Sequence, residues 1–197
     1  MLERPEFLER AREVMAALGA RGAVHLRSAL LTTARRYELA LTLRDQQERT
    51  GCWLMVNDRL DIALASGARA VQLTSRSLAI SDARALAPAL PIGASAHTPD
   101  EARAAAAAGA DWIVAGHLFA TASHPGTSGR GVGFIEEMVA ATALPCIAIG
   151  GIRPEHVARL RAVGVYGVAA ISGIWGADDA DRAAREYLSA YDEQRGS

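Results

Sequence analysis

The sequence contains no lysine: its 21 basic side chains are all arginine, against 22 acidic ones. This absence excludes Schiff-base chemistry and lysine phosphate clamps. The net charge is −1 and no basic run is present, so we expect neither nucleic acid nor a membrane surface as a partner. Aromatic residues make up only 5% of the chain, and the scattered Trp53, Trp112 and Trp175 are predicted to pack rather than to stack on nucleobases.

Cysteines and long apolar runs are also scarce. Cys52 and Cys146 are the only two cysteines, and both lie in apolar runs where a small buried thiol is ordinary. The N-terminal segment is charged, and no apolar stretch behind it is long enough for a signal peptide or a membrane span. We therefore expect a cytoplasmic protein whose partner is a small molecule.

Half of the 197 residues are apolar, which is enough for one large core, so a single domain over residues 1–197 is predicted. Short apolar runs alternate with helical patterns, as in repeated βα units around a parallel sheet. The predicted strands are 23–27, 53–57, 70–73, 91–95, 112–115, 145–149 and 167–171. The predicted helices are 5–18, 30–49, 59–66, 81–87, 99–108, 133–141, 154–162 and 180–191.

Seven predicted strands with eight helices are one strand short of a (β/α)8 TIM barrel, and the chain opens on a helix. The predicted fold class is therefore an α/β TIM barrel whose first β-strand is missing. Either the natural start lies upstream, or the barrel has an open seam between its eighth and second strands. An open seam would expose strand edges that proteins normally cover, so a homodimer is a further expectation.

Polar residues follow several predicted strands, where a barrel keeps its chemistry. Arg27, Asn57, Gln72 and Ser95 lie at four of these ends. The last two strands are followed by glycine-containing turns, at the place where barrels commonly hold a phosphate on backbone N–H groups. These turns contain Gly150, Gly151, Ile171, Ser172 and Gly173. The alternative is that Gly150 and Gly151 only make a tight turn.

A long glycine-rich loop, residues 116–131, carries two histidines after an apolar strand. His117 opens the loop, and an imidazole suits proton transfer near neutral pH. His124 lies further on, where it either contacts a ligand or is solvated. Among the other histidines, His25 is predicted to be structural and His156 to be a surface residue. His97 follows Ser95 at a strand end, and whether it lines the mouth of the barrel is left open.

Five segments, 56–64, 92–97, 109–112, 148–152 and 168–174, resemble the thiamine phosphate synthase superfamily. The resemblance implies a barrel in which only the first strand is missing. In that superfamily the synthase joins a pyrimidine diphosphate to a thiazole phosphate, using Mg²⁺ carboxylates and two lysines. This chain has Ala29 and His124 where the lysines are expected, and Ser77 in place of the second carboxylate.

The run Gly116-His117-Leu118-Phe119 resembles the TenI-type thiazole tautomerase branch of the superfamily. That branch implies an isomerase that aromatises a carboxythiazole phosphate without metal or cofactor, with His117 moving the proton. Arg27 would then bind the substrate carboxylate. The other substrate-binding residues would be Asn57, Gln72, Ser95, Thr121, Ser123 and His124. The alternatives are a thiamine phosphate synthase and a non-catalytic regulator that binds a thiazole or thiamine phosphate.

Overall fold

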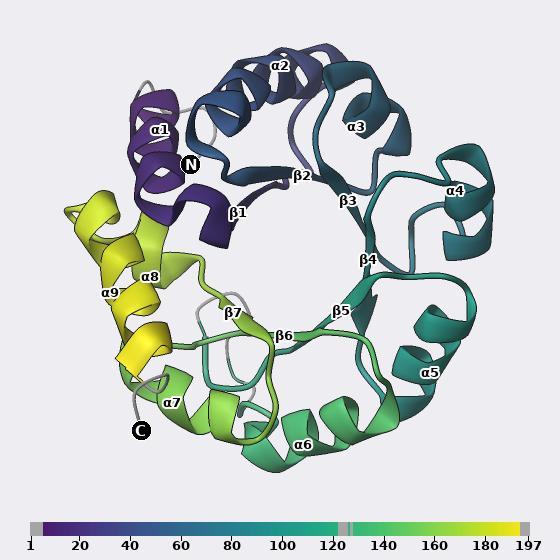
Figure 1. Ribbon diagram of the computed structural model, residues 1–197, viewed down its shortest axis with the longest axis vertical. Coiled ribbons are helices and arrows are strands. Elements are labelled where there is room, and N and C mark those ends of the chain that lie inside the picture. Colours follow the sequence, from purple (N-terminus) through teal and green to yellow (C-terminus); the bar gives the residue numbers. More distant parts are fainter. Residues whose placement is uncertain (1–5, 122–125, 127, 194–197) are drawn as a thin grey trace. The chain divides into compact units, whose positions relative to one another are not determined.

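The computed structural model describes residues 6–121, 126 and 128–193. Two compact units divide the chain, Met1–Ile92 and Gly93–Ser197, and each consists of βα repeats (Figure 1). The single domain expected over the whole chain stays a prediction. None of the helices described is both long and apolar enough to cross a membrane.

The first unit is built from parallel strands that pair in chain order, β1 with β2 and β2 with β3. Its helices lie on one side of these strands (Figure 1). The elements are α1 (Phe7–Leu18), η1 (Gly19–Arg21), β1 (Ala23–Leu26), α2 (Thr33–Thr50), β2 (Trp53–Asn57), α3 (Leu60–Ser66), β3 (Ala70–Leu73) and α4 (Ile80–Leu86).

The two faces of these three strands differ in chemistry. Successive side chains of a strand point to opposite faces, and residues in register point to the same face. One face is apolar and buried beneath the helices: Val24, Leu26, Leu54, Val56, Val71 and Leu73. The opposite face carries His25, Met55, Asn57, Ala70 and Gln72. Polar groups are therefore gathered on the face turned away from the helices.

The second unit repeats the same plan, with neighbouring strands parallel from β4 to β7. Its helix-facing core is made of small and branched side chains such as Ile113, Ala115 and Ala148, all fully buried. The elements are β4 (Ile92–Ala96), α5 (Pro99–Ala107), β5 (Trp112–Gly116), α6 (Gly131–Ala141), β6 (Cys146–Ile149), α7 (Pro154–Ala162), β7 (Gly167–Ala169), α8 (Ser172–Trp175) and α9 (Ala180–Asp192).

Helix starts follow the expected capping chemistry. At α5 the Thr98 hydroxyl accepts a hydrogen bond from the N–H of Glu101 at 3.2 Å. The Glu101 carboxylate in turn accepts from the N–H of His97 at 2.6 Å, one residue before the position that a capping box uses. At α7 the Nδ1 atom of His156 accepts from the N–H of Arg153 at 3.1 Å.

Many element boundaries differ from the prediction by one to three residues, and three of these differences have a clear description. Helix α2 begins at Thr33 rather than at residue 30, because the Thr32 hydroxyl caps it by accepting from Arg35 N–H. Helix α6 begins at Gly131, two residues early. Strand β7 ends at Ala169, and the residues beyond it turn into α8, a helix of four residues that is too short to give a periodic sequence pattern.

The two cysteines pack as predicted. Cys52 and Cys146 are 0% and 2% exposed. Burial raises the pKa of the Cys52 thiol to about 12 and that of the Cys146 thiol to about 11. Both thiols therefore stay protonated at neutral pH and act as small apolar side chains.

Candidate functional site

The polar face of the first unit brings together two residues that the sequence singled out. Asn57 ends β2 and Gln72 lies on β3, and the two are in register, so their side chains leave the same face of neighbouring strands. Both are buried, at 9% and 2% exposed. Buried amides need hydrogen-bond partners, so this face is a place where a polar ligand can be held.

His25 joins these amides, although it was predicted to have only a structural role. It shares their face, and burial lowers the pKa of its imidazole to about 4, with the Arg27 charge adding to the fall while Asn57 and Asp58 oppose it. The imidazole is therefore neutral at physiological pH. Among the described residues, His25 Nε2 and Asn57 Oδ1 are buried atoms without a well-formed hydrogen bond, although the two side chains lie close enough for Asn57 to raise the pKa of His25. Such atoms are rare unless a ligand or water completes them.

Asp58 organises the loops that follow β2 and β3. Its Oδ1 atom accepts hydrogen bonds from the hydroxyls of Thr74, at 2.8 Å, and of Ser77. Its Oδ2 atom accepts from Asn57 Nδ2 at 2.5 Å, and its N–H donates to Gln72 O at 2.9 Å. Asp58 has a positive φ of 60°, a conformation that Asp and Asn tolerate better than other side chains. The carboxylate is thus fixed by three donors.

The residues of this cluster do not form a protein-built Mg²⁺ site of the kind that the resemblance implies. The residues described contain no group of three or more His, Cys, Asp or Glu side chains arranged to hold a metal ion. Ser77 donates to Asp58 rather than offering a second carboxylate, and both Asp58 oxygens already accept hydrogen bonds. Magnesium is usually held by carboxylates together with water and substrate phosphates, and here only one carboxylate lies in the cluster.

Arg27 follows β1 and is exposed. Its neighbour Ser28 is tied back to α2, because Ser28 O accepts a hydrogen bond from Arg36 at 2.5 Å. Arg59, directly after Asp58, has a different partner: its guanidinium donates to both oxygens of Asp61. Arg27 is therefore a cation at the strand ends that can meet a negatively charged ligand.

The second unit builds its strand-end loops on backbone contacts. Beyond β5 the chain continues alongside the end of β6, with Leu118 N–H donating to Ile149 O and Phe119 N–H to Gly150 O, both at 3.0 Å. The loop returns at Arg130, whose N–H donates to His117 O at 3.1 Å. His117, the predicted catalytic residue, is half-buried at the root of this loop.

Glycines make this close approach possible. A Cβ atom on Gly116 would lie 2.2 Å from Ile149 O, and one on Gly150 would lie 2.4 Å from the Cβ of His117. A Cβ on Gly151 would lie 2.5 Å from Ala120 O. Gly150 and Gly151 also have positive φ angles of 105° and 64°. These glycines are therefore explained by packing and backbone conformation, and phosphate binding by them stays a prediction.

The other predicted residues of this unit lie at separate places on the loops. Ser95 is on β4, and Thr121 is on the loop after β5. His97 is exposed, and its carbonyl accepts from Arg130 at 2.5 Å while the Arg130 guanidinium stacks on Phe134 at 3.7 Å from the ring centroid. Ile171 precedes α8, and Ser172 and Gly173 are its first two residues. Ser123 and His124 lie outside the described residues.

His156 is more than a surface residue. Its ring packs against Phe119 with centroids 4.2 Å apart, while its Nδ1 caps α7. The side chain therefore connects the helix after β6 to the loop after β5. The prediction of a plain surface position missed this contact because nothing in the sequence indicates which loop residue lies above a helix start.

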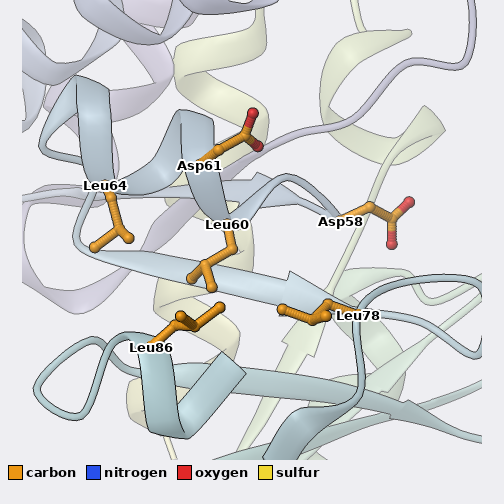
Figure 2. Close-up of a pocket in the computed structure, with 6 residues that line it drawn as sticks. All are labelled: Asp58, Leu60, Asp61, Leu64, Leu78 and Leu86. Carbon is orange, nitrogen blue, oxygen red and sulfur yellow. The ribbon is translucent and has the colours of Figure 1, made fainter. Parts of the chain in front are cut away.

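An apolar cavity of about 390 Å³ lies on the helical side of the first unit. Figure 2 shows that it is lined by leucines of α3, of α4 and of the loop between β3 and α4, while the carboxylates of Asp58 and Asp61 point away from them. Its leucines are Leu60, Leu64, Leu78 and Leu86. The cavity is thus chemically unlike the polar face of the strands.

Comparison with solved structures identifies the class of fold. The solved structure of thiamine phosphate pyrophosphorylase from Pyrococcus furiosus matches with a TM-score of 0.87 at 33% identity, covering 99% of this chain and 93% of that one. The chain thus has an α/β fold of parallel strands, consistent with a TIM-barrel-like fold lacking one strand, as predicted.

Sequence comparison gives the family. Residues 3–174 match the family model of thiamine monophosphate synthase. A thiamine-phosphate synthase from Pyrococcus horikoshii is 36% identical over 165 residues, which cover 84% of this chain and 80% of the relative. The bifunctional protein ThiM/ThiE of Symbiobacterium thermophilum is 39% identical over 175 residues, and the match spans only 36% of its length. The chain belongs to the thiamine monophosphate synthase family.

These relatives correct the predicted activity. The sequence favoured a tautomerase, an isomerase, yet the curated relatives from Pyrococcus horikoshii, Pyrococcus abyssi and Natronomonas pharaonis are named thiamine-phosphate synthase, which is a transferase. The prediction gave too much weight to the pair Gly116-His117 and to the three replaced residues, Ala29, Ser77 and His124. The comparisons support the family and do not distinguish the tautomerase branch within it.

Proposed function

We propose that the chain is a thiamine-phosphate synthase that joins a pyrimidine diphosphate to a thiazole phosphate. The observation that carries this proposal is the buried polar face of the first unit, where His25 Nε2 and Asn57 Oδ1 have no well-formed hydrogen bond among the described residues. A pyrimidine carrying an amino group offers both donors and acceptors to such atoms. The similarity to synthases over most of the chain supports the same reading.

In this reaction the thiazole nitrogen attacks the methylene carbon of the pyrimidine. The new C–N bond forms as the C–O bond to the diphosphate breaks, and the diphosphate leaves with the electron pair. Negative charge grows on the leaving group, so a guanidinium that binds two oxygens at once stabilises the transition state. Since the chain has no lysine, we assign this role to Arg27, and no step here is routed through a metal.

Asp58 has a positioning role in this scheme. Its carboxylate accepts from Asn57, Thr74 and Ser77, which fixes the amide of Asn57 with its Oδ1 left over for the ligand. The predicted phosphate-binding loops, 150–151 and 171–173, would hold the thiazole phosphate. His117, Ser95 and Thr121 remain predicted ligand contacts, and a cytoplasmic location and a homodimer remain predictions.

A second candidate is a regulator that binds the same ligands without turnover. The observation that favours it is the poor fit of the Asp58 cluster to Mg²⁺, because Ser77 replaces the second carboxylate and donates to the first. Binding of the thiazole phosphate would then be retained while no product is formed.

The deciding experiment incubates the purified protein with hydroxymethylpyrimidine diphosphate and thiazole phosphate, with and without Mg²⁺. Thiamine phosphate is followed by thiochrome fluorescence. We expect product from the wild type and roughly a 100-fold lower rate from Asp58→Asn, because Asn tolerates the positive φ but cannot accept all three hydrogen bonds. Asp61→Asn removes a carboxylate paired with Arg59, and its rate should stay within about twofold of the wild-type rate.

Two results would contradict the proposal. Thiazole phosphate binding without any product would favour the regulator. Product formation that is unchanged in Asp58→Asn would place the chemistry away from this cluster.

A further inference from the structure

The loops after β6 and β7 share a contact with one side chain, that of Tyr187 on α9. Tyr187 is buried, with 7% of its surface exposed. Its hydroxyl donates a hydrogen bond to Ile152 O at 2.7 Å. The same hydroxyl lies against Gly173, since a Cβ atom on Gly173 would be 2.2 Å from the Tyr187 oxygen. One buried hydroxyl therefore contacts the residue after Gly151 and the second residue of α8.

This contact explains why residue 173 is glycine. A glycine within a helix is less favourable than an alanine, so its presence needs a reason. At Gly173 the reason is space, because the oxygen of Tyr187 occupies the volume that a Cβ would take. The next nearest atom, Tyr187 Cζ, would be 3.2 Å away, so the hydroxyl alone makes the position too small for a side chain.

We propose that Tyr187 is a positioning residue that sets the spacing between loop 150–152 and loop 171–173. Two loops that hold one phosphate between them must keep their N–H groups within about 0.5 Å of the productive geometry. The hydroxyl fixes one loop by a hydrogen bond and the other by contact. The inference rests on the proposed function in one respect, namely that the ligand of these loops is a thiazole phosphate.

Helix α9 offers a matched control one turn further along. The Tyr191 hydroxyl donates to Tyr166 O at 2.7 Å, and Tyr166 precedes β7, whereas α8 follows it. Tyr187→Phe and Tyr191→Phe therefore delete the same chemical group and the same kind of hydrogen bond. Only the first deletion touches the two loops.

The test measures binding of hydroxyethylthiazole phosphate and of the unphosphorylated hydroxyethylthiazole by calorimetry. We expect Tyr187→Phe to weaken the phosphorylated ligand roughly three- to tenfold and to leave the alcohol unchanged. Tyr191→Phe should change neither. Equal weakening of both ligands, or equal effects of the two variants, would mean that Tyr187 only stabilises the fold and would overturn the proposal.

A double variant tests the contact itself. Gly173→Ala should weaken binding of the phosphorylated ligand by more than about tenfold, because the new Cβ pushes against the hydroxyl. Adding Tyr187→Phe removes that oxygen, so the double variant should bind better than Gly173→Ala alone. A double variant that binds worse than Gly173→Ala would refute the contact. If Gly173→Ala fails to fold, the pair of tyrosine variants still decides.

These readouts separate the inference from the proposed function. A wild type that prefers the phosphorylated ligand but forms no thiamine phosphate would remove the synthase proposal and leave the Tyr187 test intact. A wild type that shows no preference for the phosphorylated ligand would overturn the role of Tyr187, whatever its turnover.

Discussion

The two units differ in what fixes the loops at their strand ends. At the strand ends of the first unit, side chains hold one another: Asp58 accepts hydrogen bonds from three neighbours, near His25 with its buried Nε2 atom. In the second unit, backbone hydrogen bonds join the loop after β5 to the end of β6. Gly116, Gly150 and Gly151 let these segments approach within distances that a Cβ would forbid. The loops of the first unit should therefore be sensitive to the polarity of a substituted side chain, whereas those of the second unit should be sensitive to its volume.

The largest effect is expected at Gly150 in the second unit, where a crowded position coincides with a positive φ. Gly150→Ala adds a Cβ that would lie 2.4 Å from the Cβ of His117, at a φ of 105°. We expect the free energy of unfolding to fall by about 3 kcal/mol or more, from the combined strain and overlap. Urea denaturation measures it.

Gly133→Ala is the matched control. Gly133 lies within α6, and a Cβ there would have no neighbour within 4 Å. The free energy of unfolding of this variant should rise by about 0.5 to 1 kcal/mol. If both variants lose stability equally, close approach is not the reason for Gly150.

A change of pH should act on the first unit. The folded-state pKa of His25 is about 4, against 6.5 for an ordinary histidine. Between these values the unfolded chain binds the proton and the folded chain does not, so stability is full above pH 6.5 and declines as the pH falls toward 4. The loss is at most about 3.5 kcal/mol, from a pKa difference of about 2.5 units at roughly 1.4 kcal/mol per unit.

The His25→Gln variant makes this dependence measurable. Denaturation midpoints followed from pH 7 to pH 4 should decline less steeply in His25→Gln than in the wild type. His97→Gln, which changes an exposed histidine, should follow the wild type. A parallel decline in all three proteins would mean that His25 does not titrate as a buried group.

The contrast between the units also explains how far the sequence could be interpreted. The βα alternation predicted all seven strands that the structure describes, because apolar runs and capping residues are local signals. The sequence could predict that Asn57 and Gln72 lie close together, because parallel strands bring their carboxyl ends to one edge. The face of His25 was left open, since alternation within one strand does not say which face the helices cover.

The second unit was harder to predict because its determinants are not local. Glycine pairs after β6 fit both phosphate binding and tight turns, and only the structure shows that His117 and Ala120 press against them. Tyr187 carries no signal in the sequence, since a tyrosine in an amphipathic helix is ordinary core. The tautomerase prediction failed for a related reason: the pair Gly116-His117 and the replaced lysines and carboxylate are local features, and they outweighed the names that the relatives carry.

His156 gives the smallest effect and tests whether its side chain contributes to the order of the loop after β5. It caps α7 through Nδ1 and packs on Phe119. His156→Ala should lower the free energy of unfolding by about 1 kcal/mol, a typical value for losing a cap or an aromatic contact.

Two further variants divide that cost between the cap and the ring. His156→Asn keeps a side-chain acceptor for Arg153 N–H, whereas His156→Phe keeps a ring against Phe119. If the ring holds the loop, hydrogen exchange at the Phe119 amide, which donates to Gly150 O, should quicken in the Asn variant and stay slow in the Phe variant. The reverse pattern would assign the loop's order to the start of α7. Equal exchange in both would mean that the backbone contacts hold this loop by themselves.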